Sequence, residues 1–193
     1  MDDAQVERAR AGDVQALDHL MTTVYTLAYR SALQFWNDVD RAEDTAQDVC
    51  VRVLRALPRY RPQGQFRAWI LQITFNVLRH QWRYERVRRW FHRISPNAFG
   101  GRSPEDQAMD QNEFQWLIRG LQHLSVNERM ALILRAFHDL HYGEIAQVMG
   151  CSLQQVKNYI FRARQKLRRR WAQEVGYGKD VPSVSDAMDG SPG

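Results

Sequence analysis

The residues best suited to chemistry lie between Leu140 and Trp171, where cations, amides and an aromatic ring share one helical face. From position 157 to position 170 there are seven cations and no acid. Arginine and amide side chains hydrogen-bond base edges, an aromatic ring contacts thymine methyl groups, and outlying cations bind phosphates. The pattern therefore predicts a surface that reads duplex DNA, made of Gln154, Lys157, Asn158, Phe161, Arg162 and Gln165.

The elements that must position this surface are two helices joined by a turn. At about 100° per residue, one narrow stripe of the second helix is apolar and predicts its buried side: Val156, Ile160, Ala163 and Leu167. A short helix over 142–149 precedes it, Gly150 occupies the turn, and Ser152 with Gln155 forms a capping box. This order predicts a helix-turn-helix whose second helix enters a major groove. A merely solvated basic face would not account for Phe161.

A second candidate surface is acidic and lies on the helix expected over 41–57. Residues 37–48 carry five acids against the single cation Arg41. Asp44, Gln47 and Asp48 stand opposite the apolar stripe of that helix. Acids early in a helix complement its dipole, which is one interpretation. The other is a docking face for a basic protein partner, and both stay open at this point.

The loop that follows, residues 58–65, holds Arg59, Tyr60 and Arg61 between prolines. Arginine and tyrosine on a restrained loop can stack on and hydrogen-bond an unpaired base. An ordinary surface turn with incidental cations is the alternative interpretation.

The next helix, expected over 66–91, is apolar on two sides and is therefore predicted to be sandwiched by its neighbours. One of the two stripes includes Tyr84. A polar strip between the stripes contains Asn76, Arg79 and Arg83, with Trp69 on its border. The strip favours contact with a nucleic-acid strand, although Trp69 could equally serve packing alone.

The periodicity fails after residue 91, where Pro, Gly, Ser and Asn cluster. We expect an all-α fold of two small helical domains, 1–91 and 104–175, joined by a flexible linker over 92–103. Asp13 is expected to be the N-cap of a core-forming helix near the start of the chain. Ser103 and Pro104 are expected to start the second domain, and Ser125 with Glu128 forms another capping box. The segment 176–193 has few apolar residues and is expected to be disordered.

The bulk properties exclude several classes of protein. A net charge of +5 and a pI of about 9.5 are compatible with a polyanionic partner. Cys50 and Cys151 form no disulfide framework, and His138 and His141 have no third metal ligand in register, so we expect a cytoplasmic protein without metal or cofactor. No apolar run approaches the ~20 residues of a membrane helix. No phosphate loop or nucleophile-base pair indicates an enzyme.

The order of these parts resembles the extracytoplasmic-function (group IV) sigma factors of bacterial RNA polymerase. The stretch RAEDTAQDVCVRVLRALPRYRPQGQFRAWILQITFN is similar to the second sigma region, and LSVNERMALILRAFHDLHYGEIAQVMGCSLQQVKNYIFRARQKL to the fourth. The resemblance implies an alternative sigma factor that binds core polymerase and promoter DNA and is controlled by an anti-sigma factor.

The resemblance also assigns roles to residues. Asp44, Gln47 and Asp48 would contact the polymerase clamp. The loop 59–61, with Asn76 and Trp69, would hold a base flipped from the minus-ten element, and positions 157, 158, 161 and 162 would read the minus-thirty-five element. The sequence departs from the family pattern at Gln154, Gln155, Tyr159 and His141. The competing interpretation is a free-standing helix-turn-helix regulator that binds DNA as a dimer.

Overall fold

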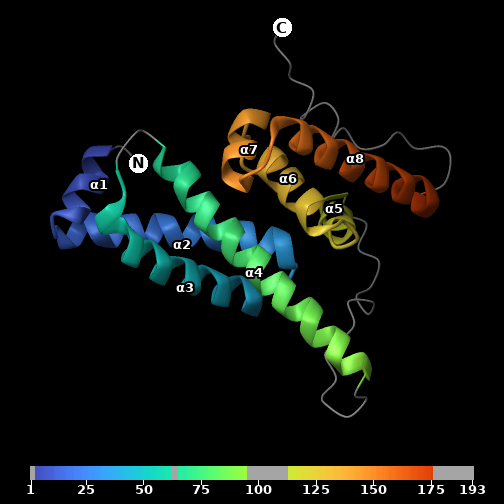
Figure 1. The fold of residues 1–193 in the computed structure, drawn as a ribbon, viewed down its shortest axis with the longest axis horizontal. Helices are drawn as coiled ribbons and strands as arrows, with labels where there is room; N and C mark the ends of the chain where they lie inside the picture. Colours follow the sequence, from blue (N-terminus) through green and yellow to red (C-terminus); the bar gives the residue numbers. More distant parts are fainter. Residues whose placement is uncertain (1–2, 62–64, 95–112, 176–193) are drawn as a thin grey trace, which may run out of the picture.

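The computed structural model describes residues 3–61, 65–94 and 113–175, and these residues form helices without any strand (Figure 1). The elements are α1 (Asp3–Arg10), α2 (Val14–Trp36), α3 (Val39–Ala56), the 3-10 turn η1 (Leu57–Arg59), α4 (Phe66–Ile94), α5 (Glu113–Leu121), α6 (Val126–Ala136), α7 (Tyr142–Met149) and α8 (Leu153–Val175). We call α1–α4 the N-terminal bundle and α5–α8 the C-terminal bundle. The all-α expectation is confirmed.

Side-chain caps set the helix starts where the sequence predicts them. The Asp13 carboxylate accepts from the Ala16 amide at 3.0 Å at the start of α2. Ser125 and Glu128 form the expected capping box of α6. A cap accepts a hydrogen bond from an amide in the first turn that has no partner inside the helix. Because that amide is three residues further along the chain, a cap can be recognised from the sequence.

The ends of some elements differ from the expectation. The α3 helix begins at Val39, because Asp38 is its N-cap, and α4 continues to Ile94, past the expected end at residue 91. The sequence analysis missed α1, an eight-residue helix that buries Val6 and Ala9 against the N-terminal bundle. The expected helix start at Ser103, most of the linker and the tail 176–193 lie outside the described residues.

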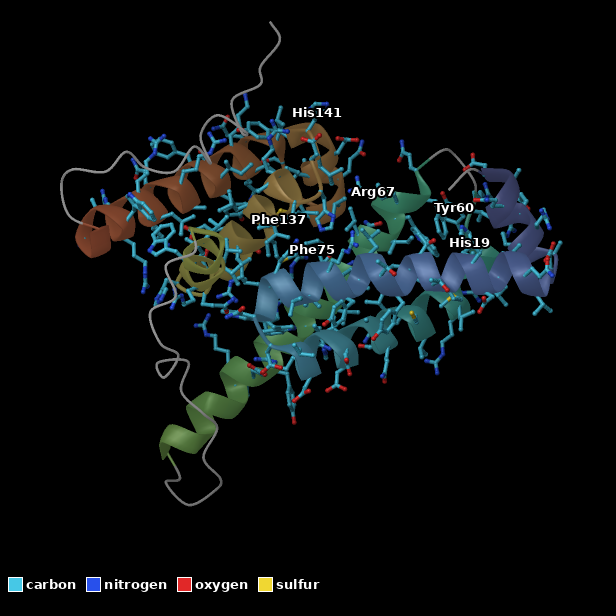
Figure 2. All side chains as sticks on the ribbon, turned by 180° about the vertical axis from the view of Figure 1, so that it is seen from behind. His19, Tyr60, Arg67, Phe75, Phe137 and His141 are labelled. Carbon is cyan, nitrogen blue, oxygen red and sulfur yellow. The ribbon has the colours of Figure 1, made fainter. Side chains whose placement is uncertain are left out.

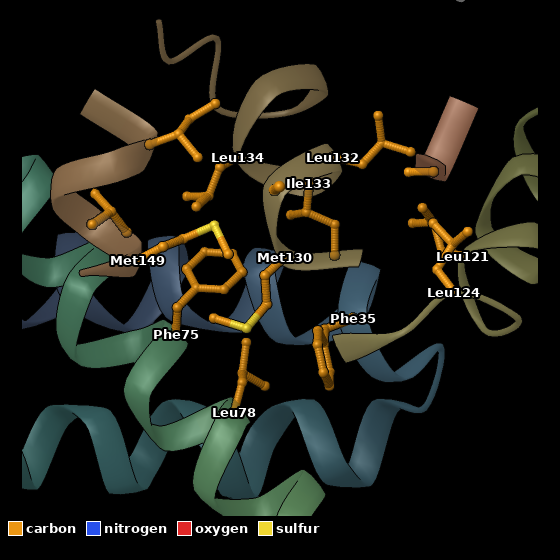
Figure 3. Packing of buried hydrophobic residues seen from close by; sticks show 14 of the residues in the cluster. Phe35, Phe75, Leu78, Leu121, Leu124, Met130, Leu132, Ile133, Leu134 and Met149 are labelled. Atoms are coloured by element: carbon orange, nitrogen blue, oxygen red, sulfur yellow. The ribbon is translucent and has the colours of Figure 1, made fainter. Parts of the chain in front are cut away.

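One apolar core joins the two bundles (Figure 3). Phe35 of α2 and Phe75 of α4 lie in the same cluster as Met130 and Ile133 of α6, and all four are fully buried. A fully buried side chain of this size contributes about 1.5–3 kcal/mol relative to an exposed one. The described parts of the two expected domains therefore pack directly on each other.

The expectation for Tyr84 is wrong, because this side chain is 66% exposed. The reason is tertiary: the C-terminal end of α4 extends beyond α2 and α3, so the stripe that contains Tyr84 has no neighbour there (Figure 1). Along the first part of the helix the expected burial holds for Phe66, Ile70 and Leu71. Within the described ranges, no helix is long and apolar enough to cross a membrane.

Candidate nucleic-acid and protein interfaces

The helix α8 displays every member of the predicted duplex-reading set. Gln154, Lys157, Asn158, Phe161, Arg162 and Gln165 are all exposed. Phe161 is 60% exposed, beside a hollow of about 340 Å³ that Tyr142 and Arg164 also line. Val156, Ile160, Ala163 and Leu167 are buried on the other side, as expected. An aromatic ring left in solvent among cations and amides gives this face an apolar contact surface as well as hydrogen-bonding groups.

The turn before α8 has the geometry that the sequence predicts. Gly150 ends α7 with a φ of 63°, in the left-handed region that glycine adopts at little cost. The Gln155 amide donates to the Ser152 hydroxyl at 3.2 Å, and the Ser152 amide donates to the Gln155 side chain at 2.9 Å. The capping box therefore sets the direction in which α8 leaves the turn.

An ion pair holds α8 against α6. Lys166 lies 2.7 Å from the Glu128 carboxylate, whose side chain is 5% exposed. Burial alone would raise the pKa of Glu128, but hydrogen bonds from Lys166 and Ser125 outweigh it and hold the pKa below its usual value. Asn127 also donates to the Tyr159 hydroxyl at 3.3 Å, so Tyr159, where the sequence departs from the family pattern, contributes to bracing α8.

The acidic face of α3 is only partly exposed to solvent. Asp44 and Gln47 are exposed, whereas Asp48 is half-buried and accepts from Arg52 at 2.8 and 3.1 Å. Sequence reasoning missed Val51 and Leu54, which are 45% and 43% exposed. Their signal was available: both fall outside the buried stripe. Val51 lies two turns along the helix from Asp44 and one turn from Asp48, and Leu54 lies two turns along from Gln47.

Most of the polar candidates for the opened strand are exposed: Arg59, Arg61, Asn76 and Arg83. Tyr60 differs from the expected position, because it is 8% exposed and packs on Phe66 and Trp69, with ring centroids 5.3 and 4.6 Å away. Trp69 is half-buried in the same cluster. We call these three packed rings, Tyr60, Phe66 and Trp69, the aromatic wall.

Arg79 is half-buried at the junction of the two bundles, not in an open polar strip. Its Nη2 donates to the Met149 carbonyl at 3.2 Å, at the C-terminal end of α7. The last carbonyls of a helix have no partner inside it and carry the negative end of the dipole, so a guanidinium is a favourable cap. In this arrangement Arg79 binds the C-terminal bundle.

A second arginine caps a helix across the junction in the opposite direction. Arg129 of α6 donates from Nη1 to the Phe35 carbonyl at 2.9 Å, and Gln122 donates to the same carbonyl at 3.0 Å. Arg129 is 5% exposed, and its guanidinium carbon lies 4.9 Å from the centre of the Phe35 ring. The C-terminal end of α2 is therefore closed by residues of the C-terminal bundle.

His138 also belongs to the junction. Its Nε2 lies 3.0 Å from the Ser31 hydroxyl, and that hydroxyl donates to the Leu27 carbonyl at 2.7 Å. Since the hydroxyl has one proton, Nε2 must be the donor to Ser31. Burial, with a smaller contribution from Arg67, lowers the pKa of His138 to about 4, so the imidazole is neutral near pH 7. Arg67, labelled in Figure 2, donates to the His138 carbonyl at 3.0 Å.

The two histidines considered as metal ligands have other positions. His138 is held by Ser31, and His141 is the N-cap residue of α7. In the three described stretches of chain, no three His, Cys, Asp or Glu side chains are placed to hold a metal ion.

This combination of a helix-turn-helix and a second helical bundle with exposed arginines defines a nucleic-acid-binding protein. Comparison with known proteins gives the family. The family model for sigma-70 region 2 matches residues 20–94, and the model for sigma-70 region 4 matches residues 114–167. The RNA polymerase sigma-H factor of Pseudomonas aeruginosa is 31% identical over 183 residues, covering 86% of this chain and 91% of that protein. The ECF RNA polymerase sigma factor ShbA of Streptomyces griseus is 31% identical over 176 residues, covering 86% and 92%.

Solved structures agree in fold. The structure of CnrH in complex with the cytosolic domain of CnrY matches with a TM-score of 0.67 and 24% identity, covering 90% of this chain and 98% of that one. The sigma factor RpoE in complex with the anti-sigma factor NepR, from Bartonella quintana, matches with a TM-score of 0.62 and 22% identity, covering 81% and 96%. The chain belongs to the extracytoplasmic-function sigma factors of RNA polymerase. It is an alternative sigma factor and not an enzyme, and the free-standing regulator is not favoured.

Proposed function

We propose that this sigma factor binds core polymerase and two promoter elements through three separate surfaces. The observation that best supports the proposal is the exposed face of α8. Residues 1–91, with the rest of α4, would bind core polymerase and the minus-ten element. Residues 104–175 would bind the minus-thirty-five element, and residues 92–103 would link them. On α8, Lys157, Asn158 and Arg162 would contact base edges and phosphates, while Phe161 would contact a thymine methyl group.

The core polymerase would dock on the exposed face of α3. Asp44 and Asp48 supply negative charge, and the exposed Val51 and Leu54 supply apolar area beside it. A partner helix with cations flanking an apolar stripe would match this face in charge and in hydrophobicity. Gln47, exposed between the acids and the apolar pair, would add a hydrogen bond.

The opened minus-ten strand would lie along the loop and α4. Arg59, Arg61 and Arg83 would bind its phosphates, and Asn76 would contact a base. Extruding one base from the duplex costs a few kcal/mol of stacking and pairing, which stacking on an aromatic side chain can offset. Tyr60, between Arg59 and Arg61 in the chain, packs on Trp69 in the aromatic wall, so a small rotation of either ring would offer a stacking surface.

The two bundles must separate for both elements to be bound at once. DNA rises about 3.4 Å per base pair, so roughly 25 base pairs between the two elements span about 85 Å. A compact chain of this length has a radius of gyration of about 16 Å, which corresponds to a diameter of roughly 40 Å. Binding to the polymerase would break the contacts of Arg79 and Arg129 across the junction, and Arg79 would then become available to the strand.

An anti-sigma factor is the further partner that we propose. Two proteins of similar fold were solved in complex with such partners or their domains. The exposed α3 face and the junction between the bundles are surfaces that a partner could cover to block polymerase. We place the protein in the cytoplasm, where polymerase and promoter DNA are found, with an anti-sigma factor able to hold it at the inner membrane face.

The experiment is to mix the purified protein with bacterial core polymerase, then to measure complex formation by gel filtration and transcription from its own upstream DNA. The variant Asp44→Lys with Asp48→Lys should lose both. The control, Glu7→Lys with Asp18→Lys, makes the same change of charge at exposed acids away from α3 and should retain both. If the wild type forms no complex with core polymerase and binds duplex DNA as a tight dimer, the proposal is wrong.

A further inference from the structure

A groove of about 350 Å³ lies between α2 and the first turns of α4. Sequence reasoning did not identify it, because its two walls are far apart in the chain. Its lining is Thr22, Thr23, Thr26, Leu27, Arg30, Phe66, Arg67 and Ile70. Phe66 also belongs to the aromatic wall with Tyr60 and Trp69, so the groove continues from the site proposed for the opened strand.

The groove has an apolar floor and two cations. The half-buried Leu27 supplies apolar surface to this floor, and Phe66 and Ile70 lie buried beneath it. Arg30 and Arg67 are exposed, and no acid is among the lining residues. A guanidinium donates hydrogen bonds and accepts none, so the cations favour a ligand with anionic oxygens.

The threonines of the groove supply hydrogen-bond acceptors, whereas the arginines supply donors. The hydroxyls of Thr22, Thr23 and Thr26 donate to the carbonyls four residues earlier, at 3.0, 3.1 and 2.9 Å. Each hydroxyl proton is thereby used, so the oxygens present acceptor lone pairs to the groove. Amino groups on a base edge are donors that match them, while a phosphate, which only accepts, does not.

We propose that this groove is a subsite for an unpaired nucleotide of the opened DNA strand, next to the nucleotide at the aromatic wall. Arg30 and Arg67 bind the phosphate, the ring lies on the apolar floor, and the threonine oxygens accept from the base edge. The assignment rests on the proposed sigma function. An acidic peptide would satisfy the cations, but it offers no flat apolar group for the floor.

Arg30 is the residue with which to test the subsite. Arg67 also donates to the His138 carbonyl, so replacing it would disturb the junction between the bundles as well. Arg30 lines the groove, is exposed, and is the one lysine or arginine of α2. A conservative companion is Thr26→Val, which removes the acceptor oxygen and keeps the shape of the side chain.

The test uses holoenzyme on its own promoter DNA, with the minus-ten strands mismatched so that they are already unpaired. Arg30→Gln should shorten the lifetime of this complex by about tenfold, the loss expected for one hydrogen bond from a charged group, and Thr26→Val should shorten it less. The control Arg8→Gln removes one exposed cation outside the groove and should leave the lifetime unchanged. All variants should bind core polymerase as the wild type does.

The outcomes separate the two proposals. If the wild type forms no complex with core polymerase, the sigma function and the subsite are both withdrawn. If the wild type works and Arg30→Gln dissociates at the wild-type rate, the subsite alone is overturned. If a poly-glutamate peptide binds the wild type but not Arg30→Gln, while the DNA lifetimes are equal, the groove takes an acidic peptide and the nucleotide assignment is wrong.

Discussion

The contact between the two bundles should depend on Arg129, and Arg129→Met tests it. Methionine keeps the unbranched apolar stem and removes the guanidinium. The variant loses the hydrogen bond to the Phe35 carbonyl at 2.9 Å and the contact with the Phe35 ring. The variant also loses the bonds from Arg129 to the side chain and carbonyl of Gln122, at 2.8 and 2.7 Å, but these lie within the C-terminal bundle. Gln122 can still donate to the Phe35 carbonyl, 3.0 Å away, so α2 keeps part of its cap.

The magnitude follows from these contacts. A hydrogen bond from a charged group contributes about 1.5–3 kcal/mol, and a desolvated cation over an aromatic ring about 0.5–2 kcal/mol. The junction should therefore lose about 2–5 kcal/mol, which raises the ratio of separated to joined bundles by roughly 30- to 5000-fold.

Small-angle scattering measures this separation. The radius of gyration of Arg129→Met should exceed that of the wild type, because more molecules have parted bundles. The control is Arg135→Met, on the same helix, whose hydrogen bond to the Leu140 carbonyl and ion pair with Asp139 stay within the C-terminal bundle. Equal radii for the two variants would refute the role given to Arg129.

Three further predictions concern single side chains. Phe161→Ala should change the free energy of unfolding by less than about 0.5 kcal/mol, because the ring is 60% exposed. It should weaken duplex binding roughly tenfold, and unchanged fluorescence anisotropy titrations would contradict this. Lys166→Met should cost about 1 kcal/mol at pH 7, since the exposed lysine is partly screened. Because the pKa of Glu128 is lowered in the folded chain, this stabilisation is present above the usual carboxyl pKa and is lost as pH falls through the folded pKa. Urea unfolding over a series of pH values downward from 7 should show the difference shrink as the pH falls. The pKa of His138 falls from 6.5 to about 4 on folding, so below pH 6.5 the unfolded chain binds a proton that the folded chain does not. Stability should drop by about 2 kcal/mol between pH 7 and pH 5, and a His138→Asn variant should lack this part of the drop.

Sequence reasoning succeeded where the signal is local. Asp13, Ser125 and Ser152 begin helices through bonds to residues three positions away, so the capping motif is visible in the chain itself. The exposed face of α8 was predicted for a similar reason. The spacing of apolar residues shows which side of a helix is buried. The opposite side can then be identified as exposed without knowing which element packs against the helix.

The same reasoning failed where burial depends on what lies opposite. The period of α4 places Tyr84 on an apolar stripe, yet the helix extends past its neighbours and leaves that ring 66% exposed. Tyr60 lies in a loop of prolines and arginines, yet it is buried against Trp69. A pattern within one element carries no information on where the adjacent elements end.

By itself the sequence determined most of the helices and of their buried faces, the helix-turn-helix and the resemblance to a sigma factor. Tertiary structure alone decided what the junction residues do. Arg79 caps α7 from 70 positions away, Arg129 caps α2 from 94 positions away, and His138 meets Ser31 across 107 positions. A short-range pattern specifies a face through residues three or four apart, whereas these hydrogen bonds exist because a shared apolar core brings distant helix ends together.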